Sequence, residues 1–550
     1  MKDYAWFKKY PEKIPHEIDP DRYSSLVDLF EQCVRRYSDL PAFESFGKIL
    51  SYSDIDRLTR DFAAFLQKKG LKKGDKIAIQ LPNTLQYPVA LFGALRAGLT
   101  VVNTNPMYTA REMRDKFQDS EAKAIVIMAN FACRLEKIIG MTGIKTVIVT
   151  EIGDLVGGVK GSLINFVVRR IKKMVEPFNL PGHVKFNNVL KEGSGEKFTP
   201  VEVSNDDIAF LQYTGGTTGI SKGAVLKHRN ILANVEQISA WMLPTLVDMK
   251  EIIITPLPLY HIFALTVNFF SFFNKGAKNI LIADPRNIPG FIKEIKDTKF
   301  TAMTGVNTLY NAMLNNSDFH KMNFSTLKVV IAGGMALQKA VAERWKKATG
   351  IPLCEGYGLT ESSPVLTCNP IDGTDRTGTI GVPLPSTEIM IADENGNEVE
   401  IGKIGELLGK GPQVMEGYWN KPDETALVFV NGWLKTGDLG FIDEDGFITI
   451  VDRKKDMIII SGFNVYPNEI EQIAITHPGV LEAGAVGGKD EDGNEYVKLF
   501  IVKKDPDLTR EDIYKHCREN LTNYKLPKVI EFRDELPKTN VGKILRRELK

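Results

Sequence analysis

Helix-like and strand-like segments alternate through the first 200 residues of the chain. Apolar residues within 58–69 and 87–97 recur at the spacing of an amphipathic helix, and a glycine follows each segment. The short apolar runs 76–81 and 124–128 have the length and composition of buried strands. Strands that alternate with helices in this way predict an α/β fold with a mostly parallel sheet.

The alternation resumes after residue 205. Strands are predicted over residues 208–213, 252–256 and 328–332, each followed by a loop and then a helix. From Gly378 onward, short β-like stretches are separated by turn sequences such as DENGN and DEDG. Turns at such short intervals predict an antiparallel β subdomain.

A further change of pattern occurs at the charged stretch 452–456 (DRKKD). A chain of 550 residues is too long for one compact core, so we expect at least two domains. We predict an N-terminal domain of residues 1–451, a hinge at 452–456 and a small C-terminal α/β domain of residues 457–550. Within the C-terminal domain, residues 468–477 are predicted to form a helix.

Composition narrows the class of protein. With 43% hydrophobic and 25% charged residues, the chain reads as an ordinary soluble globular protein. Its 70 basic and 69 acidic residues give no overall attraction for nucleic acid or membrane, so we predict no nucleic-acid partner. Five cysteines without metal-binding spacing fit a reducing cytoplasm. The longest apolar run, 262–273, is too short to span a membrane and is predicted to be a core element.

One segment, 160–176, stands out by its charge, since it carries five basic residues and one acid. On a helical wheel its apolar residues share one face and most of the charge lies opposite. This is the pattern of a helix on an anionic membrane surface, but also of a surface helix packed on its own domain. The apolar face comprises Leu163, Val167, Ile171, Met174 and Val175.

Candidate chemistry begins with the loop 213–224 (YTGGTTGISKGA), which follows an apolar strand and is expected to precede a helix near Arg229. Glycines let backbone amides approach phosphate oxygens, hydroxyl groups add donors and Lys222 adds positive charge. A Walker A loop would need a glycine and a hydroxyl residue where this chain has Ser221 and Gly223. Taken alone, the loop could also be a glycine-rich turn with surface hydroxyl groups, although phosphate binding is favoured.

Four more motifs follow downstream: 356–361 (GYGLTE), 436–438 (TGD), 452–453 (DR) and 537–543 (PKTNVGK). With the loop, they stand in the order found in the adenylate-forming acyl-CoA synthetase family, which the sequence resembles over essentially its whole length. The likeness is greatest to bacterial long-chain fatty acyl-CoA synthetases, through PLYHIFALT, DRKKDMII, SGFNVYPNEIE and NVGKILRREL. The resemblance implies a large N-terminal domain and a small, mobile C-terminal domain.

The resemblance also implies a two-step reaction. Fatty acid and MgATP give acyl-AMP and diphosphate, and CoA then gives acyl-CoA and AMP. Lys543 is expected to stabilise charge on the phosphate during the first step, as electrostatic catalysis of phosphoryl chemistry requires. The small domain then rotates about Lys455. The rotation brings the CoA-binding loop to the site, and that loop comprises Ser461, Gly462, Phe463 and Asn464.

Individual nucleotide contacts follow from the matched motifs. Tyr357 is expected to stack on adenine and Thr360 to contact phosphate, while Glu361 helps to hold Mg²⁺, which prefers oxygen ligands. Asp438 is expected to accept hydrogen bonds from both ribose hydroxyls, with Arg453 near ribose and phosphate. The other expected nucleotide-binding residues are Thr214, Gly215, Gly216, Thr217, Thr218, Gly219, Lys222, Gly333, Gly334, Gly356 and Gly358.

The acyl pocket is expected to include His261, Leu265 and Gly334. Some long-chain members carry a gating Trp at the position of Leu265, so we expect no such gate here. We assign catalytic roles to Lys543, Glu361 and His261, although a hydrogen-bonded core histidine remains an alternative for His261.

Several alternatives for the function stay open. Within the enzyme class, the chain could be a CoA ligase for aryl or medium-chain acids. It could also be a non-catalytic lipid-binding membrane scaffold, or a kinase with a variant phosphate loop that produces ADP. By resemblance we further expect peripheral contact of segment 160–173 with the inner face of the cytoplasmic membrane, and a homodimer.

Overall fold

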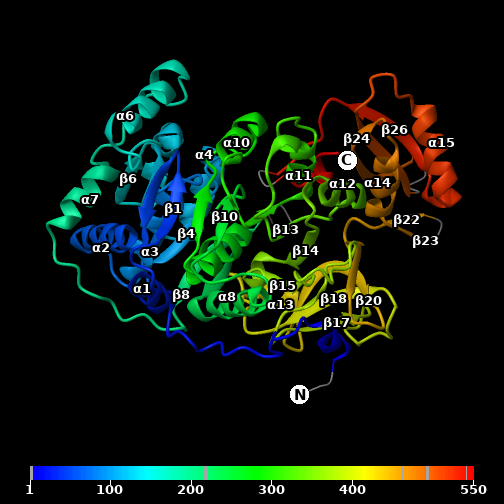
Figure 1. Cartoon of the computed structure of the whole chain (residues 1–550), viewed down its shortest axis with the longest axis horizontal. Coiled ribbons are helices and arrows are strands. Elements are labelled where there is room, and N and C mark those ends of the chain that lie inside the picture. Colours follow the sequence, from blue (N-terminus) through cyan, green and yellow to red (C-terminus); the bar gives the residue numbers. More distant parts are fainter. Residues whose placement is uncertain (1–3, 215–220, 461–462, 491–494, 540–541, 550) are drawn as a thin grey trace.

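The computed structural model describes residues 4–214, 221–460, 463–490, 495–539 and 542–549. Two large sheets with helices between and around them form the first part of the chain (Figure 1). The first sheet has the order β7-β6-β5-β3-β4-β8-β9, and all its pairs are parallel except β8 with β9. Its strands are β3 (Lys76–Gln80), β4 (Thr100–Asn103), β5 (Ala122–Met128), β6 (Thr146–Thr150), β7 (Val184–Lys185), β8 (Ile208–Thr214) and β9 (Lys222–Lys227).

The second sheet has nine strands in the order β16-β15-β14-β13-β12-β10-β11-β1-β2. Its central strands, from β14 to β1, pair in parallel. The predicted α/β fold with mostly parallel sheets is therefore confirmed. The strands are β1 (Pro41–Ser45), β2 (Lys48–Ser51), β10 (Ile252–Thr255), β11 (Lys278–Leu281), β12 (Ala302–Gly305), β13 (Val329–Ala332), β14 (Leu353–Gly358), β15 (Val365–Cys368) and β16 (Val382–Pro383).

A layer of buried helices joins the two sheets. Every residue of α3 (Gln86–Arg96) and of the π-helix η5 (Ala264–Ser271) is buried. One hydrophobic cluster combines side chains of both sheets with those of α3, η5 and α8 (His228–Met242). A helix that is apolar on all sides is stable only when it is buried on all sides. The apolar run 262–273 is therefore a core element, as predicted, and none of the described helices is both long and apolar enough to cross a membrane.

The antiparallel β subdomain predicted after Gly378 is present. Its five-stranded sheet has the order β17-β18-β20-β19, with β21 on β20, and every pair is antiparallel. The strands are β17 (Glu388–Ala392), β18 (Gly405–Lys410), β19 (Phe429–Val430), β20 (Trp433–Ile442) and β21 (Ile448–Arg453).

The C-terminal part packs around a core of its own, whose buried residues begin at Ile458 (Figure 1). This separation supports the hinge at 452–456, which stays a prediction. The predicted helix 468–477 is α14 (Pro467–Thr476). The other elements are β22 (Ile458–Ile460), β23 (Phe463–Val465), β24 (Val480–Lys489), β25 (Glu495–Lys503), α15 (Arg510–Asn520) and β26 (Pro527–Arg533).

The phosphate loop leads into strand β9, which pairs antiparallel with β8, and helix α8 then begins at His228, close to the helix predicted near Arg229. One sequence prediction needs correction. The segment 160–176 is not one helix: α6 (Gly158–Phe166) continues as a π-helical turn, η4 (Val167–Ile171), and stops there. Lys173 has a φ of 51°, a left-handed conformation that ends a helix.

Candidate active site

The site lies where β13 and β14 end, the edge at which parallel sheets bind ligands. Gly333 and Gly334 follow β13, and the end of β14 carries Gly356 and Tyr357. A Cβ at Gly333 would lie 2.9 Å from the Phe263 ring and 3.1 Å from the carbonyl oxygen of Gly356. Only glycine therefore lets the chain pass between these groups.

Tyr357, Asp438 and Arg453 form one hydrogen-bonded group. The Tyr357 hydroxyl donates to Asp438 Oδ2 over 2.6 Å, and Arg453 Nε lies 3.1 Å from Asp438 Oδ1. The register of β20 and β21 places Asp438 directly opposite Arg453. Burial and the neighbouring Asp438 raise the pKa of Tyr357, so its hydroxyl stays a donor. Each carboxylate oxygen of Asp438 keeps a lone pair, which fits acceptance from a vicinal diol.

Lys543 reaches this group from the C-terminal part of the chain. Gly542 packs against Thr308 of α11 (Asn307–Leu314), where an added Cβ would lie 2.4 Å from the Thr308 hydroxyl oxygen. Surrounding protein atoms, and then repulsion by Arg453, lower the pKa of Lys543 to about 8, while Asp438 opposes the shift. The structure thus brings Lys543, Asp438 and Arg453 together, as the motifs predict.

His261 lies in the same electrostatic neighbourhood. Burial and the nearby positive charge of Lys543 lower the pKa of His261 to about 4. Its imidazole is therefore neutral at physiological pH. A neutral ring beside an apolar pocket can position a carboxylic acid without adding a competing cation.

Glu361 is held by a tyrosine that the motifs do not include. The Tyr418 hydroxyl donates to Glu361 Oε1 over 2.6 Å, which leaves Oε2 for a cation. No three metal-ligating side chains gather within the described ranges. Mg²⁺ often takes only one or two carboxylates and completes its shell with phosphate and water, so a single Glu361 fits this ion.

The phosphate loop is described only at its two ends. Thr214 accepts a hydrogen bond from the Ser221 hydroxyl over 2.7 Å through its carbonyl oxygen. Lys222 lies in β9 and forms an ion pair with Glu424 of α13 (Pro422–Val428). The predicted phosphate contacts Gly215, Gly216, Thr217, Thr218 and Gly219 lie outside the described residues.

Only two residues of the predicted CoA-binding loop, Phe463 and Asn464, are among the described residues. Ser461 and Gly462 lie outside the described residues. Phe463 is exposed on β23 and stacks on Tyr524 with ring centroids 4.8 Å apart, and Asn464 is exposed beside it. Their role stays a prediction.

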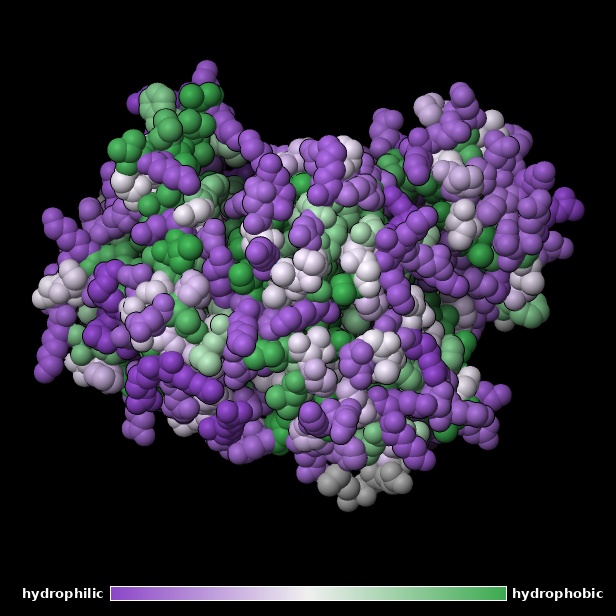
Figure 2. Space-filling view, viewed as in Figure 1, coloured by the Kyte–Doolittle hydropathy of each residue, from purple (hydrophilic) through white to green (hydrophobic). Residues whose placement is uncertain are grey.

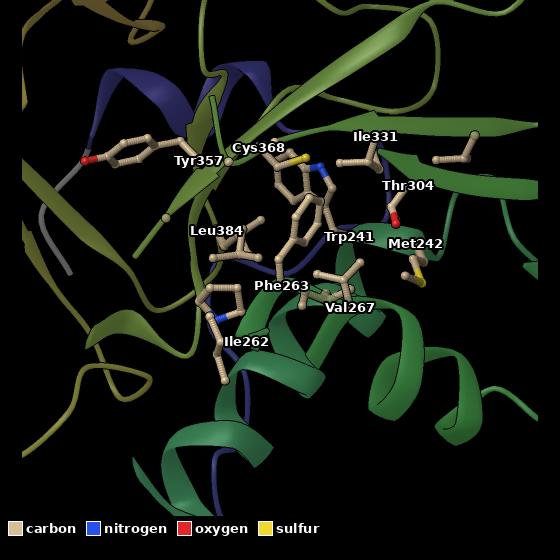
Figure 3. Close-up of a pocket in the computed structure, with 18 of the residues that line it drawn as sticks. Trp241, Met242, Ile262, Phe263, Val267, Thr304, Ile331, Tyr357, Cys368 and Leu384 are labelled. Carbon is tan, nitrogen blue, oxygen red and sulfur yellow. The ribbon is translucent and has the colours of Figure 1, made fainter. Parts of the chain in front are cut away.

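A deep apolar cavity opens from the nucleotide side (Figure 3). His261, Gly334 and Thr360 line it near the site, and Trp241 and Met242 of α8 line it deep in the protein. The helical side of the cavity carries Ile262, Phe263 and Val267, and the strand side carries Thr304 and Ile331 (Figure 3).

Leu265 does not line this cavity, which corrects the predicted acyl-pocket set. Phe263 and Val267, four residues apart, face the cavity from one side of the helix. Leu265 therefore points the other way and is fully buried in the core between the two sheets.

Three candidate functional residues were not predicted from the sequence, for different reasons. Tyr418 and Glu424 contact residues that are 57 and 202 positions away, so no local pattern marks them. Arg546 forms ion pairs with Asp452, within the predicted hinge, and with Glu471 beyond it, at 3.0 and 2.8 Å. Arg546 is part of the motif NVGKILRREL, but the motif does not indicate the acidic residues with which Arg546 pairs.

Comparisons with known proteins agree with this geometry. Residues 30–419 match the family described as AMP-binding enzyme, and residues 469–543 match the AMP-binding enzyme C-terminal domain. A long-chain-fatty-acid–CoA ligase of Yersinia pestis is 54% identical over 99% of this chain and 97% of its own length. One of Haemophilus influenzae is 50% identical over 99% of this chain and 98% of its own length.

A solved structure, ATP-bound MatB from Rhodopseudomonas palustris, covers 95% of this chain and 98% of its own chain. It superposes with a TM-score of 0.80 at 28% identity. These matches over nearly the whole chain establish that it belongs to the AMP-binding enzyme family.

Proposed function

We propose that this protein is an ATP-dependent fatty acyl-CoA synthetase that works through an acyl-adenylate. One observation carries the proposal: a deep apolar cavity runs into the core from Tyr357 and His261, which neighbour Asp438 and Lys543. An acid bound there would place its carboxylate at the nucleotide and its hydrocarbon in the cavity. Apolar cavities with a few convergent polar groups are typical ligand sites.

In the first step, a carboxylate oxygen attacks the α-phosphate of ATP and diphosphate leaves. Lys543 offsets the negative charge that builds on the phosphoryl oxygens, and Asp438 holds the ribose. Glu361, positioned by Tyr418, would hold Mg²⁺, which would neutralise phosphate charge. In the second step, the CoA thiolate attacks the acyl carbonyl and AMP leaves.

The change between steps is proposed to use the hinge at Lys455. In this structure Lys543 reaches into the nucleotide side, which suits the first step. The second step needs Lys543 to leave so that CoA can approach. Rotation about residues 452–456 would withdraw Lys543 from the site and bring loop 461–464 into position to contact CoA.

The length of the cavity favours fatty acids over aryl acids. A single aromatic ring would occupy the part near His261 and Gly334, and the part near Trp241 would stay empty. Each methylene buried there contributes about 0.8 kcal/mol. The long-chain relatives reported above support the same choice.

The test is CoA-dependent AMP formation with palmitate, octanoate and benzoate at matched concentrations. We expect palmitate to give the highest kcat/KM and the nucleotide product to be AMP. ADP as product would support the kinase alternative. Preference for benzoate would support the aryl ligase, and absence of any acid-dependent diphosphate release would support the lipid-binding scaffold.

We also propose that the segment formed by α6 and η4 contacts an anionic membrane surface. Figure 2 shows hydrophobic side chains gathered on the face over α6, at the upper left. Leu163 is 59% exposed, Phe166 55% and Ile171 65%, so these side chains are not packed on the protein. Arg170 and Lys172 are exposed beside them. Exposed apolar and basic groups on one short helix fit a bilayer interface with anionic headgroups.

Vesicle sedimentation tests this contact. Phosphatidylglycerol vesicles should bind the protein more than phosphatidylcholine vesicles, and added salt should weaken binding. Leu163→Asp with Phe166→Asp should abolish it, whereas Ile401→Asp, at an exposed apolar residue of the β subdomain, should not. Salt-insensitive exclusion from anionic vesicles would contradict the proposal. The homodimer stays a prediction that the mass in solution tests.

A further inference from the structure

The acyl cavity runs along strand β13, and its length can be derived from that strand. Gly333, on the nucleotide side, and Val329, which also borders a neighbouring cavity, both line the cavity. Four residues at about 3.3 Å each give roughly 13 Å between them. An extended chain advances about 1.2 Å per bond, so this part of the cavity takes roughly eleven carbons. A longer acid needs additional space.

A second cavity, open to solvent, lies next to Val329. Thr245, Ile351 and Cys354 line it, and its mouth is at the exposed residues Pro244 and Asp372. Two residues, Val329 and Ile371, line both cavities. They therefore form the wall that separates one cavity from the other.

The backbone of this wall is fixed by hydrogen bonds from the neighbouring elements. The Thr245 hydroxyl donates to the carbonyl oxygen of Ile371 over 3.1 Å, and Trp241 Nε1 donates to that of Asn369 over 3.0 Å. Val329 is held in the sheet, paired with Ala302. Ile371 lies on a loop with its side chain buried in one hydrophobic cluster with Trp241 and Val329, so this side chain closes the passage beside Val329.

We propose that Ile371 partitions the two cavities and that the second cavity receives the ω end of acyl chains longer than about twelve carbons. The inference rests on the proposed function. It makes Ile371 a specificity-determining residue, because its side chain decides whether a long chain passes beyond Val329. Acids of ten carbons or fewer, at roughly 1.2 Å per bond, do not reach the wall.

The test is the chain-length profile of kcat/KM for CoA-dependent AMP formation, from octanoate to stearate. Ile371→Phe should block the passage, and Ile351→Trp should fill the second cavity from its far side. Each methylene kept out of an apolar site costs about fourfold in kcat/KM. We therefore expect Ile371→Phe to lower the palmitate-to-decanoate ratio on the order of a hundredfold while decanoate activity is retained.

Ile371→Leu conserves volume and is the matched control, so its profile should stay that of the wild type. A wild-type ratio in Ile371→Phe would overturn the inference, and so would an equal loss at every chain length in Ile351→Trp. If Ile371→Phe fails to fold, as its thermal unfolding would reveal, Ile351→Trp decides alone. Wild-type protein that turns over no fatty acid would instead refute the proposed function.

Discussion

Lys543 gives the sharpest quantitative prediction, because its pKa is lowered from 10.5 to about 8 in the site. A lysine with that pKa is about nine-tenths charged at pH 7 and about one-tenth charged at pH 9. The first step needs the charge. We therefore expect kcat/KM for adenylation to fall about tenfold for each pH unit above 8. The pH dependence of kcat/KM reports the pKa values of the free enzyme, which is the state that the structure describes.

Two variants separate the charge from the rest of the side chain. Lys543→Ala removes one group that stabilises the transition state, and losses of about 10²–10³ are typical of such groups. Lys543→Arg keeps a charge at every accessible pH, so its activity, even if lower, should not fall between pH 8 and 10. Bound ATP should shift the fall in kcat to higher pH, since phosphate favours the charged amine.

The assay is acid-dependent diphosphate release, which reports only the first step. Thioester formation from supplied acyl-adenylate and CoA is measured separately and should be spared in Lys543→Ala. Equal loss of both half-reactions would refute the role of Lys543. A fall above pH 8 that persists in Lys543→Arg would refute the assignment of that fall to Lys543.

Three further predictions follow from the site and its support. Lys455→Pro fixes φ at the hinge and should impair thioester formation more than diphosphate release, whereas unchanged rates of both would count against the hinge. Tyr418→Phe removes a hydrogen bond to the Glu361 carboxylate, worth about 1.5–3 kcal/mol, and should raise the Mg²⁺ concentration for half-maximal activity at least tenfold; an unchanged Mg²⁺ requirement would contradict this. Burial raises the pKa of Glu355 from 4.5 to about 7. Because the buried carboxyl group resists ionisation, the folded protein loses up to about 3 kcal/mol of stability as the pH rises from 4.5 to above 7. Glu355→Gln should therefore gain thermal stability over the wild type at pH 8 but not at pH 4.5, and an equal difference at both pH values would disprove the cause.

The local patterns of the sequence were sufficient for the elements and for most of the chemical groups. The spacing of hydrophobic residues and the positions of glycine and proline predicted the ends of strands β3 and β5 and of helix α14 to within two residues. These signals depend only on neighbours along the chain. The motifs also identified Asp438, Arg453 and Lys543, which the structure brings together. The order of the strands, and hence the place where those motifs meet, could not be derived from periodicity.

Tertiary structure decided the partners and the directions of side chains. Tyr418 reaches Glu361, and Glu424 reaches Lys222, only because the β subdomain packs against the edge of the first sheet through β9. Strand β9 was not among the predicted elements, and it forms by antiparallel pairing with β8 before helix α8 begins at His228. Leu265 faces the core and Phe263 the cavity because helix packing, not composition, sets which side of an all-apolar helix meets empty space. The sequence by itself therefore determined which groups are available for adenylation, whereas only the fold decided how deep the cavity beside them runs and where Ile371 closes it.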